Sequence, residues 1–480
     1  MKPSSKWSLW SQDSFLSIGS RGSVLSIGSV GSACSVGSGR VLRVRVQHRV
    51  GVLRAVAAVG DVGPVGDVGP VGPQGAVGPA ARPRRRDRAG TPLDLARHTS
   101  GAARVTNVEL FFDLVYVFAV TQLSHHLLHN PTITGALQTA LLLAMVWLVW
   151  AYTAWVTNWL DPERIPVRLM LIVLVLVALV MWAALPEAFG DLGLIIGIGY
   201  AVTQIGRSVF ALVALRGGPL RQNFQRILAW CVVSGALAVA GGIVTGPPRA
   251  WLWLAAVGVD LLGGVVGFYT PGLGRSVTTE WTIEGNHFAE RCQAFILIAL
   301  GESLIVIGAT LSGLLGSGIT AAEAGAFLIA VIGSVGLWWL YFDRSAAEAA
   351  RVIAASADPG RIGRTAYHLI HPVMVAGIIV VAAADEVVIS EPGAVGVAWT
   401  AWLILGGTAL FIAGHAAFKI AVWRVVPWSR LAAVAVLALL GFVAPHVPAL
   451  ALGACAAAVV IAVAALDYYP AGHRGPPAPG

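Results

Sequence analysis

The sequence predicts an all-α, polytopic integral membrane protein, a bundle of about twelve transmembrane helices. Of its 480 residues, 57% are hydrophobic and only 12% are charged, against roughly 25% charged in an ordinary soluble domain. The apolar runs are also unbroken and about 20 residues long, the length that a helix needs to cross a bilayer. Strands of a membrane barrel would be about half as long and would alternate in polarity, so a helical bundle is favoured.

Residues 1–100 differ from the rest of the chain. They are rich in Ser and Gly at the start, and from Gly60 to Gly78 glycine falls at every third position, in a collagen-like register. A triple helix this short would be marginal. We therefore interpret residues 1–100 as a low-complexity, disordered tail. A short trimerising stem and an over-long gene prediction are the alternatives.

Twelve apolar spans follow the tail, and they form two halves, residues 101–280 and 281–470, before a C-terminal tail at 471–480. The predicted spans are 105–128, 135–157, 167–186, 191–215, 227–246, 250–268, 287–311, 322–342, 366–389, 396–418, 430–446 and 448–467.

The loops between the spans predict the orientation of the chain. Every second loop carries arginines, beginning with Arg164 and Arg168, and an arginine cluster before the first span is on the same side. The opposite loops are almost free of them, with Arg249 as the lone exception. Because cytoplasmic loops carry the excess of Lys and Arg, we expect both termini in the cytoplasm.

The two halves resemble each other. Glu109 and Glu290 open spans one and seven, and the motif Trp-x-Tyr occurs in spans two and eight. Six spans is an even number, so two copies would be parallel repeats related by an axis along the membrane normal. Transporters with repeats of this kind bind their substrate between the halves.

Span one carries the most informative polar residues. Glu109 and Asp113 are four residues apart, so both carboxylates lie on one face of the helix, and Tyr116, Thr121 and Ser124 continue that face. Charges at membrane depth cost about 2.5–3.5 kcal/mol and usually face protein or water. We interpret this face as a polar stripe that the other helices enclose.

Arg207 in span four lies at a depth similar to that of Asp113, judged from the distance of each to the cytoplasmic end of its span. We therefore predict an Asp113–Arg207 pair with Glu109 below it. The alternative is a buried salt bridge that only fixes the packing of the helices, because buried pairs serve either role.

Other acids interrupt later spans. Glu302 lies past the middle of span seven without an obvious basic partner, and it could bind and release a proton; Asp260 in span six is a weaker candidate of the same type. Asp385 and Glu386 end span nine, where solvated acids at the outer surface are the expectation.

The sequence lacks signals for metals, cofactors and nucleic acid. The four cysteines (Cys34, Cys231, Cys292 and Cys455) have no metal-ligand spacing and are expected to be buried free thiols. No HExxH, P-loop, GxSxG or dinucleotide motif is present in a usable context. The net charge of +8 is confined to short loops and one tail. We expect no enzyme, no metal, no cofactor and no nucleic-acid partner.

Three motifs resemble a known family. The segments 109–114 (ELFFDL), 299–303 (ALGES) and 338–343 (WWLYFD) are similar to those of the bacterial low temperature requirement protein A family. The resemblance runs from about residue 106 to residue 469 and does not include the N-terminal tail. It implies a protein of the bacterial inner (cytoplasmic) membrane, with the lipid bilayer as a partner, that is linked by name to growth in the cold. It brings no established substrate or reaction, so no catalytic residue is carried over.

These observations lead to two principal hypotheses. The first is a proton- or ion-coupled transporter of a small solute, whose substrate or ion site is formed by Glu109, Asp113, Arg207 and Glu302 on spans one, four and seven. The second is a non-transporting sensor or scaffold that responds to lipid state or temperature; it predicts that the polar residues are paired with one another and that no cavity reaches them. A membrane enzyme ranks third, because it would need acids or histidines clustered at one water–lipid boundary.

Overall fold

The computed structural model of the protein describes residues 24–27, 33–36, 95–97, 105–218, 220–277, 284–316 and 318–467. The chain divides into two compact units, Met1–Arg86 and Asp87–Gly480. In the first unit the described residues form the strands β1 (Val24–Ile27) and β2 (Ala33–Val36), which pair in parallel. Of the predicted disordered tail at 1–100, residues 95–97 are also described, and they belong to the second unit; the rest of it falls outside the described residues, as does the tail at 471–480.

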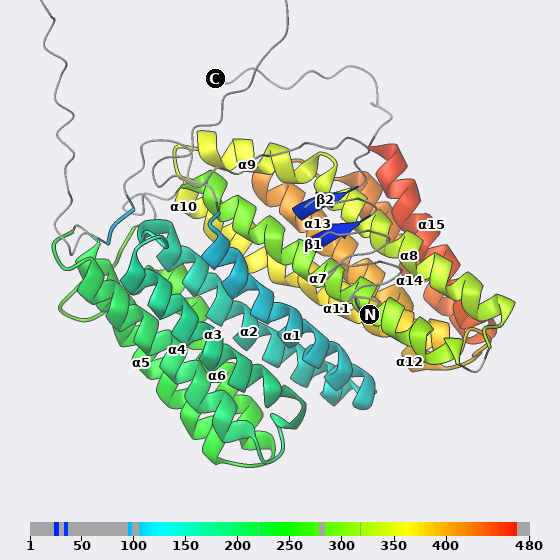
Figure 1. Ribbon diagram of the computed structural model, residues 1–480, viewed down its shortest axis with the longest axis horizontal. Helices are drawn as coiled ribbons and strands as arrows, with labels where there is room; N and C mark the ends of the chain where they lie inside the picture. Colours follow the sequence, from blue (N-terminus) through cyan, green and yellow to red (C-terminus); the bar gives the residue numbers. More distant parts are fainter. Residues whose placement is uncertain are drawn as a thin grey trace, which may run out of the picture. The chain divides into compact units, whose positions relative to one another are not determined.

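The described residues of the second unit form twelve helices that are long and apolar enough to cross a membrane (Figure 1). This confirms the predicted polytopic bundle. They are built on α1 (Asn107–His129), α2 (Ile133–Trp159), α3 (Ile165–Ala183), α4 (Gly193–Ala214), α5 (Arg221–Ile243), α6 (Pro247–Val266), α7 (Gly285–Leu315), α8 (Ala321–Phe342), α11 (His371–Ser390), α13 (Gly407–Trp423), α14 (Trp428–Val443) and α15 (Ala449–Leu466).

Short elements extend or connect these spans. They are η1 (Leu185–Glu187), α9 (Ser345–Ala355), α10 (Pro359–Ile362), the π-helix η3 (Gly363–Ile370), α12 (Ala398–Ala401), the π-helix η4 (Trp402–Gly406) and η5 (Ala444–His446). The helix α9 was not predicted, because it is short and its apolar residues cover only one face.

The ends of the helices follow ordinary capping chemistry. Both α1 and α8 begin with a capping box, in which a threonine and the glutamate three residues later bond to each other's backbone N–H: Thr106 with Glu109, and Thr320 with Glu323. Proline occupies the first turn of α3 and α6, where its missing N–H costs no hydrogen bond. Helices with these N-terminal signals begin close to the predicted boundaries of their spans.

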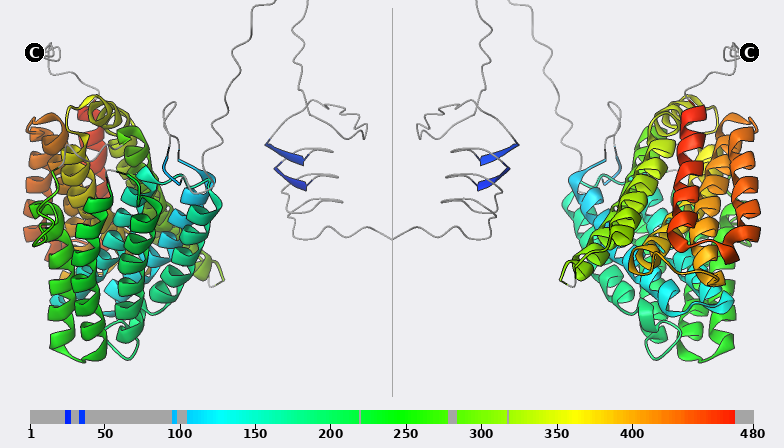
Figure 2. Two further views of the ribbon diagram at one scale, coloured as in Figure 1. Left: turned by 90° about the vertical axis from the view of Figure 1, so that its left-hand side faces the viewer. Right: turned by 90° about the vertical axis from the view of Figure 1, so that its right-hand side faces the viewer.

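The two halves of the membrane region meet along four helices. From the first half α1 and α2, and from the second α7 and α11, lie in the middle of the bundle and contact one another. The side views show the spans lying side by side along one common direction (Figure 2). Residues near the start of α1, the end of α2 and the start of α7 are thereby brought to the same end of the bundle.

The helix contacts of one half recur in the other. The contacts of α1 with α3, of α2 with α6 and of α4 with α5 correspond to those of α7 with α11, of α8 with α15 and of α13 with α14. This pattern favours a duplication, which stays a prediction. The proposed match of Glu109 with Glu290 finds no support in burial, because Glu109 is buried and Glu290 is exposed.

Arg249, the exception to the charge pattern of the loops, is buried at the start of α6. Its guanidinium donates hydrogen bonds to backbone carbonyls of the α3–α4 connection, Ala188 and Gly190, and to those of Gly241 and Val244 at the end of α5. This arginine therefore holds two connections together and is not a solvent-exposed charge.

The described cysteines are free thiols, as predicted, but only two of the three are buried. Cys231 and Cys292 lie inside the bundle, whereas Cys455 is exposed on α15. A cysteine on an apolar span can face outward, away from the protein interior, so the prediction of burial was wrong for this residue.

Candidate functional site

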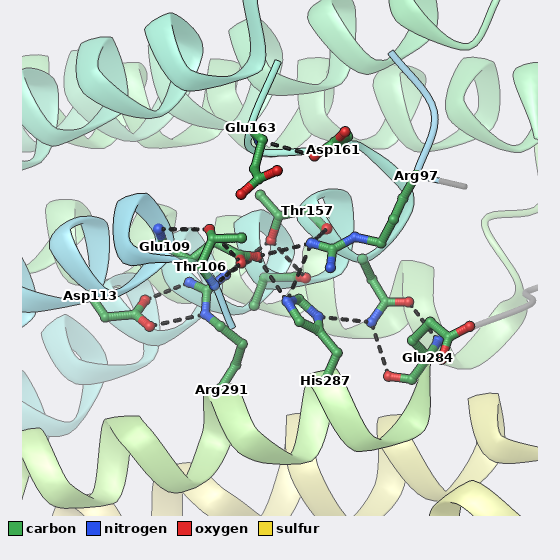
Figure 3. Close-up of polar contacts among 12 residues, drawn as sticks. Arg97, Thr106, Glu109, Asp113, Thr157, Asp161, Glu163, Glu284, His287 and Arg291 are labelled. Atoms are coloured by element: carbon green, nitrogen blue, oxygen red, sulfur yellow. Dashed lines mark hydrogen bonds and ion pairs between the residues drawn. The ribbon is translucent and has the colours of Figure 1, made fainter. Parts of the chain in front are cut away.

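A buried cluster of charges joins α1 to α7, and we call it the α1–α7 network. It consists of Arg97, Glu109, Asp113, His287 and Arg291 (Figure 3). The side chains of the last four are 0% exposed, and that of Arg97 is 10% exposed. The network connects the first helix of each half and lies at the end of the bundle where α1 and α7 begin.

Asp113 and Arg291 form the centre of the network. The Arg291 guanidinium donates from Nε to Asp113 Oδ2 at 2.9 Å and from Nη2 to Oδ1 at 2.5 Å, a bidentate pair. The indole Nε1 of Trp150 donates to the same Oδ1 at 2.7 Å, and Arg291 Nη1 donates to Thr157 Oγ1 at 2.9 Å. Both oxygens of the buried carboxylate are thus hydrogen-bonded.

Glu109 uses its two carboxylate oxygens for different tasks. Oε2 accepts hydrogen bonds from the backbone N–H and the hydroxyl of Thr106, each at 2.9 Å, and so caps α1. Oε1 faces three basic side chains: His287 Nε2 at 3.0 Å, Arg291 Nη1 at 3.3 Å and Arg97 Nη2 at 3.4 Å. The cap therefore fixes the carboxylate in the position where it meets the second half.

His287 completes the network through both ring nitrogens. Its Nδ1 faces the amide nitrogen of Asn158 at 3.3 Å. Its Nε2 lies 3.0 Å from Glu109 Oε1 and 3.4 Å from Arg97 Nη2. The ring therefore links α7 both to α2 and to the carboxylate of α1.

The two acids and their partners have matching spacings. Glu109 and Asp113 are the third and seventh residues of α1, and His287 and Arg291 are the third and seventh residues of α7. Glu109 contacts His287, and Asp113 contacts Arg291, each at a sequence separation of 178. Two successive turns of one helix therefore bind two successive turns of the other.

The predicted Asp113–Arg207 pair is wrong, because Asp113 binds Arg291. Arg207 lies on α4, and α2 separates it from α1: its guanidinium reaches the carbonyl of Val149 and the hydroxyl of Thr153, both on α2 and both at 3.4 Å. Similar depth along two spans did not make the spans neighbours.

Arg207 is a buried cation without an acidic partner among the described residues. It is 1% exposed. Its Nη2 donates to Gln204 Oε1 at 2.5 Å, its guanidinium carbon lies 5.2 Å from the ring centre of Tyr152, and its Nε has no hydrogen-bond partner within the described residues. This arrangement leaves a positive charge and a donor unsatisfied inside the bundle.

An acid in this region, Asp260 on α6, connects to Arg207 through Gln204 and makes no salt bridge with it among the described residues. Asp260 Oδ2 accepts hydrogen bonds from Tyr200 at 2.5 Å and from Gln204 Nε2 at 2.7 Å. The amide of Gln204 therefore bonds to the acid with one end and to the arginine with the other. A dipole offsets the charge of Arg207 less completely than a direct ion pair would.

Arg207 lines a cavity of about 100 Å³, which we call the Arg207 cavity. Its walls come from α2, α4, α5, α6, α10 and η3 together with the segment after α6. They include the side chains of Tyr152, Trp155, Phe268, Arg364 and His368, and no aspartate or glutamate among the described residues. The cavity therefore lies between the halves, and its lining is largely apolar and aromatic with two arginines.

The π-helix η3 supplies two of the polar groups of this cavity. Arg364 donates to the carbonyl of Gly264 at 2.9 Å, and His368 Nδ1 is buried without a hydrogen-bond partner among the described residues. The carbonyl of His368 accepts a hydrogen bond from Trp147 Nε1 at 2.7 Å. Single π-helical turns in α-helices frequently mark functional sites, because they turn side chains away from the regular helical positions.

Glu302 is buried at a separate place. It is 1% exposed, its Oε1 has no hydrogen-bond partner among the described residues, and Thr121 and His125 of α1 are the polar side chains beside it. The next residue, Ser303, contacts Ser334 of α8 at 3.1 Å between the hydroxyl oxygens. The structure thus brings Glu109 and Asp113 together, whereas Arg207 and Glu302 each lie elsewhere.

Asp385 was expected in solvent at the outer surface, and this expectation is wrong. Its Oδ2 is buried without a hydrogen-bond partner among the described residues, and the residue lines a cavity of about 40 Å³ between α8, α11, η4, α13 and α15. An acid near the end of a predicted span can still point inward when the helix continues beyond it, as α11 does to Ser390.

Reasoning from the sequence missed Arg97, Trp150, His287 and Arg291. Two signals for them were present. The segment Thr106–Glu109 has the pattern of a capping box, and His287 and Arg291 repeat the spacing of Glu109 and Asp113 at the start of the corresponding span. Arg97 lay in the predicted tail, but residues 95–97 pair with the end of α2 through the Ala96–Leu160 bridge.

Comparison with known proteins identifies the family of the chain. Residues 104–465 match the family model of the bacterial low temperature requirement A protein (LtrA). An uncharacterized protein of Rhizobium meliloti (strain 1021) is 34% identical over 382 residues, which cover 79% of this chain and 92% of the relative. No solved structure matches the chain. The match extends over all twelve spans, from α1 to α15, so the chain belongs to the bacterial low temperature requirement A protein family.

Proposed function

We propose that this multi-pass membrane protein is a proton- or ion-coupled transporter of a small solute in the bacterial cytoplasmic membrane, with both termini in the cytoplasm. One observation carries the proposal: Arg207, a buried cation without an acidic partner among the described residues, lines a cavity between the two halves. A charge that is buried but unpaired is costly unless a ligand or water completes its contacts. Sites between two halves are typical of transporters built from repeats.

The α1–α7 network acts in this proposal as a latch between the halves. Its members come from α1 and α7 and from Arg97, and they are bonded to one another. If the halves move against each other during transport, these bonds break together at one end of the bundle. Variants that weaken the latch should therefore change the rate of transport more than they change which solute is transported.

Glu302 is the proposed carrier of the coupling proton. Its carboxyl group is buried, and one of its oxygens has no hydrogen-bond partner among the described residues, so it can exchange a proton when water or a cation reaches it. Thr121 and His125 beside it provide a path of polar groups along α1.

The proposal is tested by flux in proteoliposomes that contain the full chain. Radiolabelled succinate, glycine, glucose and methylammonium represent anionic, zwitterionic, neutral and cationic solutes, and each is offered with and without an inward pH gradient. We expect accumulation of one class above the level in protein-free liposomes, with a dependence on the gradient that Glu302→Gln abolishes. Absence of protein-dependent flux for every class, together with no proton movement, would refute the transporter.

A sensor or scaffold is the second candidate, because the carboxylates of Glu109 and Asp113 are fully paired. Growth in the cold distinguishes the two functions. In cells that depend on this protein for growth at low temperature, a transporter requires Glu302, so Glu302→Gln should fail to restore growth although the protein reaches the membrane. A scaffold predicts full restoration by the same variant.

A further inference from the structure

The Arg207 cavity has the chemistry of an anion site. Its lining contains two guanidinium groups, Arg207 and Arg364, and the imidazole of His368, but no carboxylate from the part of the chain that the structure describes. Neither arginine forms a salt bridge with an acid within the described residues. A cation entering this cavity would be repelled, and a neutral solute would leave the charge of Arg207 as it is.

The bonding of Arg207 leaves room for one more partner. Its two contacts with α2 are long, at 3.4 Å, and its Nε–H is free among the described residues. Guanidinium groups bind carboxylates through charge-assisted N–H donors, so a carboxylate is the partner that this incompletely bonded guanidinium favours. Nη2, which shares one edge of the guanidinium with Nε, donates to Gln204 Oε1 at 2.5 Å.

The remaining walls of the cavity determine which hydrocarbon portion of a ligand it can hold. Tyr152, Trp155 and Phe268 present aromatic surface, which favours apolar carbon over a fully hydrated ion. A cavity of roughly 150 Å³ accommodates benzene, so a cavity of about 100 Å³ suits a smaller body. The occupant is therefore an organic acid with a short hydrocarbon chain and not inorganic phosphate.

We infer that the Arg207 cavity binds a small organic carboxylate, with its carboxylate on Arg207 and its apolar chain against Tyr152 and Phe268. The inference rests on the proposed function only in taking this cavity as the solute site; binding itself can be tested without transport. The same chemistry could come from the headgroup or fatty-acid end of a lipid, so the experiment separates the two sources.

The experiment measures binding to the purified full chain in nanodiscs of phosphatidylcholine. Butyrate, butyramide and butylammonium share a carbon chain and differ in charge, and each is titrated at constant ionic strength. Trp155 in the cavity wall allows intrinsic fluorescence to report occupancy, with thermal stabilisation as a second readout. We expect saturable binding of butyrate alone. Equal binding of butyramide, or binding of butylammonium, would overturn the inference.

Variants locate the site. Removing the hydrogen bonds of a charged pair weakens an interaction roughly 10- to 100-fold, so Arg207→Met should reduce butyrate affinity by that factor and Arg364→Met by less. Arg164→Met is the control, because Arg164 is half-exposed and outside the cavity. If Arg207→Met does not fold, Arg207→Lys keeps the charge but loses the paired donors and should still bind several-fold more weakly. Unchanged affinity in a folded variant of Arg207 would refute the site.

Two further outcomes separate the possible failures. If nanodiscs of phosphatidylglycerol prevent butyrate binding and those of phosphatidylcholine do not, the cavity is a lipid site and the inference of a soluble carboxylate fails. Binding of butyrate without any solute flux would support the inference and refute the transporter. Flux of another solute class without butyrate binding would support the transporter and refute the inference.

Discussion

Two arginines, both almost completely buried, have opposite surroundings in this protein. Arg291 is bonded to two carboxylates and a hydroxyl at 2.5–3.3 Å. Arg207 has an amide, a carbonyl, a hydroxyl and an aromatic ring around it, and no carboxylate among the described residues. A buried arginine whose charge is fully paired with carboxylates indicates a structural role in holding helices together. A buried arginine without a carboxylate partner indicates a ligand-binding role. The comparison thus assigns assembly to the α1–α7 network and binding to the Arg207 cavity.

The largest effect is expected when one member of the central pair is removed. Arg291→Met leaves the buried Asp113 carboxylate without its partner, which should lower the free energy of unfolding by about 3–5 kcal/mol. Denaturant unfolding of the purified protein in mild detergent, followed by tryptophan fluorescence, measures it.

The double variant is the control for this prediction. Replacing both partners, as Asp113→Leu with Arg291→Met, removes the unpaired charge and should recover most of the loss, because a buried ion pair contributes little against apolar residues of similar size. If the double variant were as unstable as the single one, the cost would come from packing and not from the unpaired carboxylate.

A smaller loss is expected from the indole that bonds to Asp113. Trp150→Phe removes one hydrogen bond to a charged group and should cost about 1.5–3 kcal/mol by the same unfolding measurement. Trp147→Phe is the matched control: Trp147 packs beside Trp150 with a ring-centre distance of 4.8 Å but donates to a neutral carbonyl, so about 1 kcal/mol is expected. Equal losses in the two variants would contradict a special role for the carboxylate.

The partly exposed member of the network should contribute least. Arg97 Nη2 lies 3.4 Å from Glu109 Oε1, and Arg97→Gln should cost about 0.5–1 kcal/mol, since water partly replaces the lost contact. The exposed Arg164–Asp161 pair, 3.7 Å apart, provides the comparison, and Arg164→Gln should change stability by less than about 0.5 kcal/mol. A loss above that of Trp150→Phe would show that Arg97 is essential to the network.

Arg207→Met gives the sharpest contrast, because no loss is expected. The variant removes a buried charge that no acid among the described residues neutralises, so the free energy of unfolding should be unchanged within about 1 kcal/mol or should rise. The same assay as for Arg291→Met applies. A loss as large as that of Arg291→Met would mean that the contacts of Arg207 with α2 and Gln204 hold the fold together, and the distinction between the two regions would disappear.

The fold was largely predictable, whereas the partners of the charges were not. Apolar runs are local, so the sequence located all twelve spans, and it identified Glu109 and Asp113 as two groups on one face. The depth of Arg207 is also a local property. Which span lies beside α1, and how far each helix is rotated about its axis, depends on packing among all the spans. These two quantities decided that Arg291, and not Arg207, reaches Asp113.

The acids of α1 and their basic partners on α7 are far apart in the sequence, and this separation has a consequence for synthesis. Among the twelve spans α1 has the lowest mean hydropathy, 1.2, and it carries two carboxylates whose basic partners on α7 are encoded 178 residues later. At about 5–20 residues per second a ribosome needs roughly 10–35 s to cover that distance. During this time the first helix is a poor candidate for release into lipid, so we expect it to remain beside the translocon until the second half of the chain emerges.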